Sequence, residues 1–319
     1  MSEGATGRHG ELTFTGPATF FKAPLLGQDG SGWDIGLLGV PYDFAVGFRP
    51  GARFAPAEVR QASGRFALPP AGFYDAAADR YRLRGARLVD AGDVDPAQLD
   101  TTESLLRITR AARQLRRRVS LPLFVGGDHS VSLPLLEAFD DVPDLNIVQL
   151  DAHLDFSDSR NQTALSNSSP FRRASERLPG LGGITVIGLR GMRADPEAYG
   201  AARRRGHVLV TARAVHERLQ AALEALPSGK DVYLSIDVDA LDPAELPGTS
   251  SPEPEGLSFA QLRAVIAATI GRNRLLAADL TELCPPLDPT GRSALLAARL
   301  LAEVMAAWWD GRAEKGENR

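Results

Sequence analysis

Acidic and imidazole side chains follow a short apolar run at residues 145–150. Asp151, His153 and Asp155 come directly after this run, where a buried strand is expected to end. Ionised carboxylates at the edge of a buried strand are costly unless a cation pairs with them. Residues 119–159 contain no Lys or Arg that could do so. The pattern therefore favours a metal ion as the partner of these side chains.

Two further motifs place the same kinds of side chain after apolar runs. Gly126-Gly127-Asp128-His129-Ser130 closes the run at 120–127, and Asp237-Val238-Asp239 ends the run at 231–238. Alone, each motif is typical of a turn or a helix cap. Because the carboxyl ends of parallel strands lie on one rim of a sheet, all three motifs are expected to share one site. Residues two apart on a strand also point the same way.

The ligand types indicate which metal such a site would hold. Carboxylate and imidazole groups without a thiolate suit manganese, or another hard to borderline divalent ion, better than structural zinc. Four carboxylates balance the charge of two divalent ions, and such a pair would lower the pKa of a shared water and supply hydroxide. Asp128 and Asp242 fit better as groups that orient ligands or close turns.

The rest of the chain alternates between strand-like and helix-like segments. Helical spacing of apolar residues predicts helices at 101–118, 258–270 and 292–309, the second opened by a capping box of Ser258 and Gln261. Strands alternating with helices predict an α/β fold with a parallel sheet of about eight strands, covered on both faces. The predicted strands are 33–40, 86–91, 120–127, 145–151, 183–189, 207–211, 231–238 and 275–280.

We expect one domain, because no linker or change of composition divides the middle of the chain. Residues 1–30 are expected to form an irregular arm, 31–310 the domain, and 311–319 a disordered tail. Two long loops, 41–55 and 156–170, leave the sheet at the expected carboxyl ends, where α/β sheets bind ligands. Arg160, Asn161 and Ser168 lie in the second loop and are candidates for substrate contact.

Composition and charge narrow the class of protein. A formal net charge of −4 without a basic cluster argues against a nucleic-acid surface. Cys284 is the single cysteine, which excludes an internal disulfide and fits a reducing compartment. The first residues carry no apolar signal segment, and no apolar run reaches the about 18 residues that span a membrane. We therefore expect a cytoplasmic protein that binds neither nucleic acid nor membrane.

From about residue 36 to residue 304, these motifs resemble the ureohydrolase superfamily of arginases, agmatinases, guanidinobutyrases and formimidoylglutamases. The resemblance implies a three-layer α/β/α sandwich, two Mn(II) ions and a homo-oligomer, either a trimer or a hexamer. It also implies that a metal-bridging hydroxide attacks the carbon of a small guanidino or amidino substrate, releasing urea and an amine. In Asp279-Leu280-Thr281-Glu282, the glutamate is expected to hold the guanidinium. The implied metal ligands are His129, Asp151, His153, Asp155, Asp237 and Asp239, with Asp151 and Asp237 bridging both ions.

Further matches are closest to the agmatinase group. Gly39-Val40-Pro41-Tyr42-Asp43 with Arg49-Pro50-Gly51-Ala52-Arg53 is similar to its N-terminal signature. Gly188-Leu189-Arg190-Gly191 is similar to its pattern too, whereas arginases typically carry an aspartate, used on the α-amino group of their substrate, where Gly191 stands. Arginine is therefore a poor candidate for the substrate.

One departure lies at residues 166–173, where the family usually reads Ser-His-Gly-Thr-Pro-Phe-Arg-Arg. Asn167 replaces the histidine that is thought to pass a proton to the departing amine, and an amide does not exchange protons near neutral pH. His207 and His216 are expected to be structural. Either Asn167 packs the loop while a water relay or Glu282 moves the proton, or the substrate differs. The catalytic candidates are Glu282, Asn167 and Asp128, and the substrate-binding candidates are Glu282, Asn167, Ser168 and Arg160.

These observations leave three functions open. The leading hypothesis is an agmatinase-like hydrolase of a guanidino compound. Asn167 also favours a formimidoylglutamase, a class similar to this chain in having asparagine at that place, or another amidino hydrolase. The same residue motivates a third hypothesis, an inactive paralogue that binds metal. A zinc amide hydrolase of the histone-deacetylase type fits less well, because that class uses a single metal.

Overall fold

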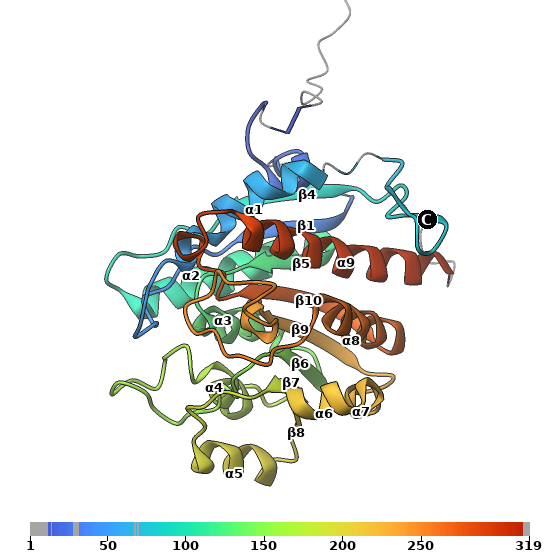
Figure 1. Cartoon of the computed structure of the whole chain (residues 1–319). Helices are drawn as coiled ribbons and strands as arrows, with labels where there is room; N and C mark the ends of the chain where they lie inside the picture. Colours follow the sequence, from blue (N-terminus) through green and yellow to red (C-terminus); the bar gives the residue numbers. More distant parts are fainter. Residues whose placement is uncertain (1–11, 14, 28–31, 67, 69, 315–319) are drawn as a thin grey trace, which may run out of the picture.

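The computed structural model describes residues 12–13, 15–27, 32–66, 68 and 70–314. Eight parallel strands form one sheet in the order β4-β1-β5-β10-β9-β6-β7-β8 (Figure 1). The strands are β1 (Trp33–Gly39), β4 (Leu88–Asp93), β5 (Val119–Val125), β6 (Leu145–Leu150), β7 (Leu181–Leu189), β8 (Val208–Thr211), β9 (Asp231–Asp237) and β10 (Arg274–Thr281).

Helices cover both faces of this sheet (Figure 1), and each face packs on its own hydrophobic core. One layer consists of α1 (Ala55–Ser63), α6 (Ala212–Glu217), α7 (Leu219–Ala225), α8 (Phe259–Arg272) and α9 (Arg292–Glu314). The other layer consists of α2 (Thr101–Arg116), α3 (Ser132–Leu136), α4 (Pro170–Arg177) and α5 (Pro196–Arg204). The predicted three-layer α/β/α sandwich is confirmed. Among the described residues, no helix is long and apolar enough to cross a membrane.

Strand β9 shows how the sequence buries both faces of the sheet. Val232, Leu234 and Ile236 pack into one core, and Tyr233 packs into the other. Alternate side chains of a strand point to opposite faces, so a strand covered on both sides needs a nearly continuous apolar run. Ser235 is the buried exception within this run, and it contacts the candidate site described below.

All eight predicted strands are present, with ends within two residues of the prediction. The predicted helices are present as α2, α8 and α9, and the capping box of Ser258 and Gln261 forms at the start of α8. Helix α9 continues through residues 311–314, which we had placed in the tail; the rest of that tail lies outside the described residues. A small antiparallel hairpin, β2 (Phe73–Asp75) with β3 (Arg80–Arg82), was not predicted.

The described part of the N-terminal arm packs against its own domain. Phe20 and Phe21 are buried in a short 3-10 turn, and the Phe20 amide donates to the Asp90 carboxylate at 2.9 Å. Arg60 of α1 pairs with the same carboxylate at 2.8 Å and lies over the Phe20 ring. The described part of the arm is therefore tied to the edge of the sheet at β4.

Gly127 allows the loop after β1 to cross directly over the end of β5. A Cβ atom at this position would lie 1.7 Å from the Tyr42 carbonyl oxygen. The next amide, of Asp128, donates to that same oxygen at 2.9 Å. The glycine therefore permits a close approach of two backbones at the rim of the sheet.

We predict that Gly127→Ala lowers the free energy of unfolding by at least about 2 kcal/mol, because neither backbone can move away without breaking this contact. Gly271→Ala is the matched control, since the exposed Gly271 lies in α8 with nothing near its would-be Cβ. The control should raise stability by roughly 0.5 kcal/mol. Chemical denaturation measures both, and equal effects of the two substitutions would contradict this account of Gly127.

Candidate metal centre and substrate cavity

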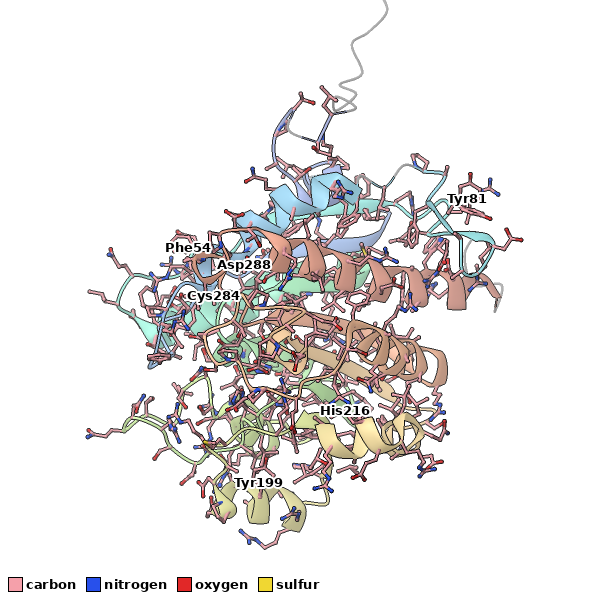
Figure 2. The ribbon with its side chains drawn as sticks, viewed as in Figure 1. Phe54, Tyr81, Tyr199, His216, Cys284 and Asp288 are labelled. Carbon is pink, nitrogen blue, oxygen red and sulfur yellow. The ribbon has the colours of Figure 1, made fainter. Side chains whose placement is uncertain are left out.

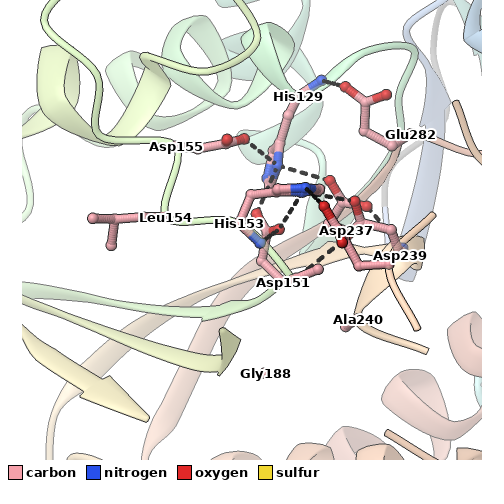
Figure 3. A network of polar contacts seen from close by, with 12 residues as sticks. His129, Asp151, His153, Leu154, Asp155, Gly188, Asp237, Asp239, Ala240 and Glu282 are labelled. Carbon is pink, nitrogen blue, oxygen red and sulfur yellow. Dashed lines mark hydrogen bonds and ion pairs between the residues drawn. The ribbon is translucent and has the colours of Figure 1, made fainter. Parts of the chain in front are cut away.

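The ends of four neighbouring strands, β5, β10, β9 and β6, bring the predicted ligands together (Figure 3). His129 follows β5, and its Nδ1 atom lies 3.2 Å from Asp151, 3.0 Å from Asp155 and 3.1 Å from Asp237. One ligand atom from each of these four residues lies within 4.8 Å of the others. The arrangement is a cage of one nitrogen and three oxygens at the rim of the sheet.

A second cage shares Asp151 with the first. His153 Nδ1 lies 2.9 Å from an Asp239 carboxylate oxygen and 3.6 Å from Asp151 Oδ1. These three residues also offer ligand atoms within 4.8 Å of one another. All six predicted metal ligands therefore meet in two adjoining groups, joined by one carboxylate.

The chemistry of the two cages fits divalent cations. His129 Nδ1 is fully buried and has no hydrogen-bond partner, although three carboxylates surround it. Burial, together with the charge of Asp151, raises the pKa of Asp155 to about 7, and burial beside Asp239 raises that of Asp237 well above its usual value. Without a cation, these carboxylates resist ionisation. A bound metal would remove that penalty.

A buried hydroxyl relay fixes which nitrogen of His129 faces the cage. Asp279 accepts hydrogen bonds from Ser235 (2.7 Å), Ser132 (2.8 Å) and Tyr233 (2.8 Å). Because the single Ser235 proton is given to Asp279, Ser235 Oγ must accept from His129 Nε2–H, which lies 3.0 Å away. The proton on Nε2 leaves the lone pair of Nδ1 free for a metal.

Glu282 lies directly beside the cages, at the end of β10. Its carboxylate accepts from the His129 amide at 2.8 Å, the Asn167 side chain at 3.2 Å and the Ser250 hydroxyl at 3.0 Å. Burial raises the pKa of Glu282. Its backbone is left-handed, with φ of 61°, a conformation that is costly for a non-glycine residue. These contacts hold one carboxylate in a fixed position.

A cavity of about 430 Å³ opens over these groups. Its wall contains four predicted substrate-contact residues, Glu282, Asn167, Ser168 and Arg160, and also Asn161. Asp128, which we had considered catalytic, is not in this wall. Its buried carboxylate instead accepts hydrogen bonds from the Ala45 amide at 2.9 Å and from the Ser130 amide. These bonds join the loop after β1 to the loop after β5. Asp242 closes a turn through Ala244 and Gly256.

Sequence reasoning missed several residues of the site. Gln149 donates to Asp151 at 2.7 Å, Ser250 holds Glu282, and Glu253 lies 3.5 Å from His153 Nε2. Arg193 lines the cavity from the loop after β7. Gln149 could have been predicted from the sequence, because a polar side chain two residues before Asp151 points to the same side of the strand as Asp151 does. The other three come from loops, where no spacing predicts direction.

His207 and His216 do not line the cavity, so neither replaces the histidine that Asn167 displaces. The His207 ring packs edge-on against Phe156, and both of its nitrogens are buried without a hydrogen-bond partner. Burial lowers the pKa of His207 to about 4. This histidine is a neutral packing group, as expected from its place at the start of β8.

We predict that Ser235→Ala weakens Mn²⁺ binding by about 10- to 100-fold, because it leaves His129 Nε2–H without an acceptor and frees the ring to turn. Ser132→Ala is the matched control, since Ser132 donates to Asp279 without contacting His129. It should bind Mn²⁺ nearly as tightly as the unmodified chain. Titration calorimetry with Mn²⁺ measures both, and equal losses would show that the relay does not act through His129.

We also predict that His207 makes the protein acid-sensitive. Its pKa is about 4 in the fold and about 6.5 when unfolded, so the unfolded chain binds more protons as pH falls below about 6.5. His207→Phe should therefore lose less stability than the unmodified chain between about pH 7.5 and about pH 5. His216→Phe, at an exposed histidine, is the control. An unchanged slope in His207→Phe would refute the prediction; denaturation midpoints provide the measurement.

Comparison with known proteins agrees with this architecture. A family model described as "Arginase family" matches residues 33–307. The chain is 33% identical to human mitochondrial guanidino acid hydrolase over 282 residues, which cover 86% of this chain and 78% of the relative. It is 35% identical to the guanidinopropionase of Pseudomonas aeruginosa, with 92% of each chain covered. A hypothetical agmatinase from Burkholderia thailandensis superimposes with a TM-score of 0.81 at 29% identity, covering 96% of this chain and 94% of that chain. The chain therefore belongs to the arginase family and is a hydrolase of carbon–nitrogen bonds.

Proposed function

We propose that this protein uses two Mn(II) ions to hydrolyse a guanidino compound to urea and an amine. The observation that carries the proposal is the position of Glu282, which lies in one cavity with both ligand cages. A buried carboxylate is the natural partner of a guanidinium group, and the cages lie where the guanidinium carbon would be attacked.

The metal ligands would divide between two ions. His129, Asp151, Asp155 and Asp237 would hold one, and Asp151, His153 and Asp239 would hold the other. Two such ions would supply hydroxide near neutral pH, which is the nucleophile that hydrolysis requires. Carboxylate and imidazole donors without sulfur favour Mn(II) over softer metals.

Glu282 would bind the substrate guanidinium and orient its carbon. Both oxygens of its carboxylate already accept hydrogen bonds, from His129, Asn167 and Ser250, and these bonds fix the orientation of the side chain. Burial raises its pKa, and a group with a raised pKa can hold a proton for the departing nitrogen. We assign that step to Glu282 because the Asn167 amide cannot perform it.

Gly191 supports a substrate other than arginine. A Cβ atom there would lie 2.7 Å from His153 Cδ2. A longer side chain at this position would therefore press on a metal ligand. Position 191 of this chain therefore lacks the carboxylate that arginases typically carry there for the α-amino group of their substrate. The relatives named above are a guanidino acid hydrolase, a guanidinopropionase and a hypothetical agmatinase, and these names agree with a substrate other than arginine.

Asn167 favours a second candidate, hydrolysis of a formimino or other amidino substrate. Hydrolysis of a formimino substrate would release formamide and an amine. The same residue keeps the inactive metal-binding paralogue as a third candidate. The homo-oligomeric state, as trimer or hexamer, and the cytoplasmic location stay predictions.

We predict that the Mn(II)-loaded protein releases urea from agmatine or guanidinobutyrate but not from arginine, and that a chelator abolishes this activity until Mn²⁺ is restored. Glu282→Gln should lower kcat/KM at least about hundredfold, because an amide cannot pair with a guanidinium. Glu224→Gln, on the exposed side of α7, is the control. Coupled assays for urea and formamide provide the measurement.

Each outcome of this assay separates the candidates. Formamide from formiminoglutamate, without urea from any guanidino compound, would replace the proposal with the second candidate. No product from any substrate, with two metals bound and histidine restored by Asn167→His, would favour the inactive paralogue.

A further inference from the structure

Two arginines line the cavity away from its acidic inner end. Arg160 lies in the loop after β6 and Arg193 in the loop after β7. Arg160 is partly exposed and Arg193 exposed, whereas the cage carboxylates are buried or nearly so. Tyr199, which lies on α5 (Figure 2), lines the same cavity. The cavity therefore has a buried acidic end, whose charge metals would neutralise, and an outer wall that carries the two arginines together with Asp195 and Glu253.

The loop that carries Arg160 is held in place. The Arg160 amide donates to the Thr163 carbonyl at 2.9 Å, and the Thr163 amide donates to the Arg160 carbonyl at 3.0 Å. Asn161 lies in the left-handed region, with φ of 50°, and its side chain lies against Gly47, where a Cβ would be only 2.6 Å away. Arg160 thus extends from a tight turn that rests on the loop after β1.

Neither guanidinium has an acidic partner. Among the described residues, Arg160 and Arg193 have no carboxylate within ion-pair distance. Neighbouring arginines differ: Arg173 pairs with Asp158 at 2.7 Å, and Arg190 donates to the backbone carbonyls of Asp239 and Glu253. An unpaired guanidinium in a cavity wall is a ready site for a carboxylate, which it can bind through two parallel hydrogen bonds.

The other acidic groups of the outer wall are already engaged. The Glu253 carboxylate accepts from the Met192 amide at 3.3 Å and lies 3.5 Å from His153. Asp195 caps the start of α5 by accepting from the Glu197 amide at 2.9 Å. Neither is within ion-pair distance of the two arginines, so their positive charge is available to a ligand.

We propose that Arg160, assisted by Arg193, binds a carboxylate at the far end of the substrate, so that the protein prefers ω-guanidino acids to guanidino amines such as agmatine. This inference rests on the proposed function, because it assumes that Glu282 binds the guanidino end. Apolar atoms of Phe156, Ala194 and Ala198 line the same cavity. They suit the short methylene chain that joins the two charged ends of such a substrate.

Three substrates that differ mainly at the far end test the proposal with the Mn(II)-loaded full chain. All three carry a guanidinium group at one end. At the other end guanidinobutyrate has a carboxylate, butylguanidine an uncharged methyl group, and agmatine an ammonium group. We expect kcat/KM to fall in that order. Arg160→Ala should raise KM for guanidinobutyrate about 10- to 100-fold with little change in kcat, and leave butylguanidine unaffected. Arg160→Glu should reverse the preference in favour of agmatine.

Arg213→Ala is the control for the loss of one positive charge. Arg213 lies on α6, is exposed, and pairs only with Glu217 of the same helix. Arg213→Ala should leave kcat/KM for all three substrates unchanged. A preference for agmatine in the unmodified chain, or an equal loss for all three substrates in Arg160→Ala, would overturn the proposal.

Calorimetry of guanidinobutyrate binding separates this inference from the proposed function. If no substrate yields urea, but the unmodified chain still binds guanidinobutyrate at least about tenfold more tightly than Arg160→Ala does, the proposed function fails and the carboxylate site stands. If urea is released and Arg160→Ala binds guanidinobutyrate as tightly as the unmodified chain, the carboxylate site fails and the proposed function stands.

Discussion

Four aspartates held within reach of two histidine nitrogens impose the main constraint on this structure. The first cage leaves His129 Nδ1 buried and without a hydrogen bond, and the second joins it through Asp151. Such a concentration of negative charge in a buried place is unstable without cations, because each carboxylate loses its hydration and repels the others. Cations bound there would stabilise the fold at the point where four central strands end.

Hydrogen bonds from surrounding residues fix the positions of these side chains and of their loops. Asp279 and Ser235 orient the ring of His129 from beneath the cage. Arg190 donates to the backbone carbonyls of Asp239, Leu241 and Glu253, so one guanidinium joins the loop after β9 to the wall of the cavity. The ligand positions are therefore built into the fold and do not have to be assembled by the metal alone.

The sequence was sufficient to predict the sheet and the meeting of the six cage residues, because both follow from where the apolar runs end. Apolar runs predicted the eight strands, and the polar motifs that follow three of them predicted that His129, Asp151 and Asp237 would meet at one rim of the sheet. The rest depends on long-range contacts. The partner of Asp128 could not be predicted from spacing, because the loop after β1 crosses the end of β5 and places the Ala45 amide against its carboxylate. Arg193 could not be predicted, since a loop has no period that gives its direction.

The manganese content of the purified chain tests the central claim most directly. After equilibration with Mn²⁺ and removal of free metal, elemental analysis should find two ions per chain in the unmodified protein. His153→Ala should retain only the ion of the first cage, because that cage does not include His153. Finding no bound ion, or a single ion in the unmodified chain, would contradict the account.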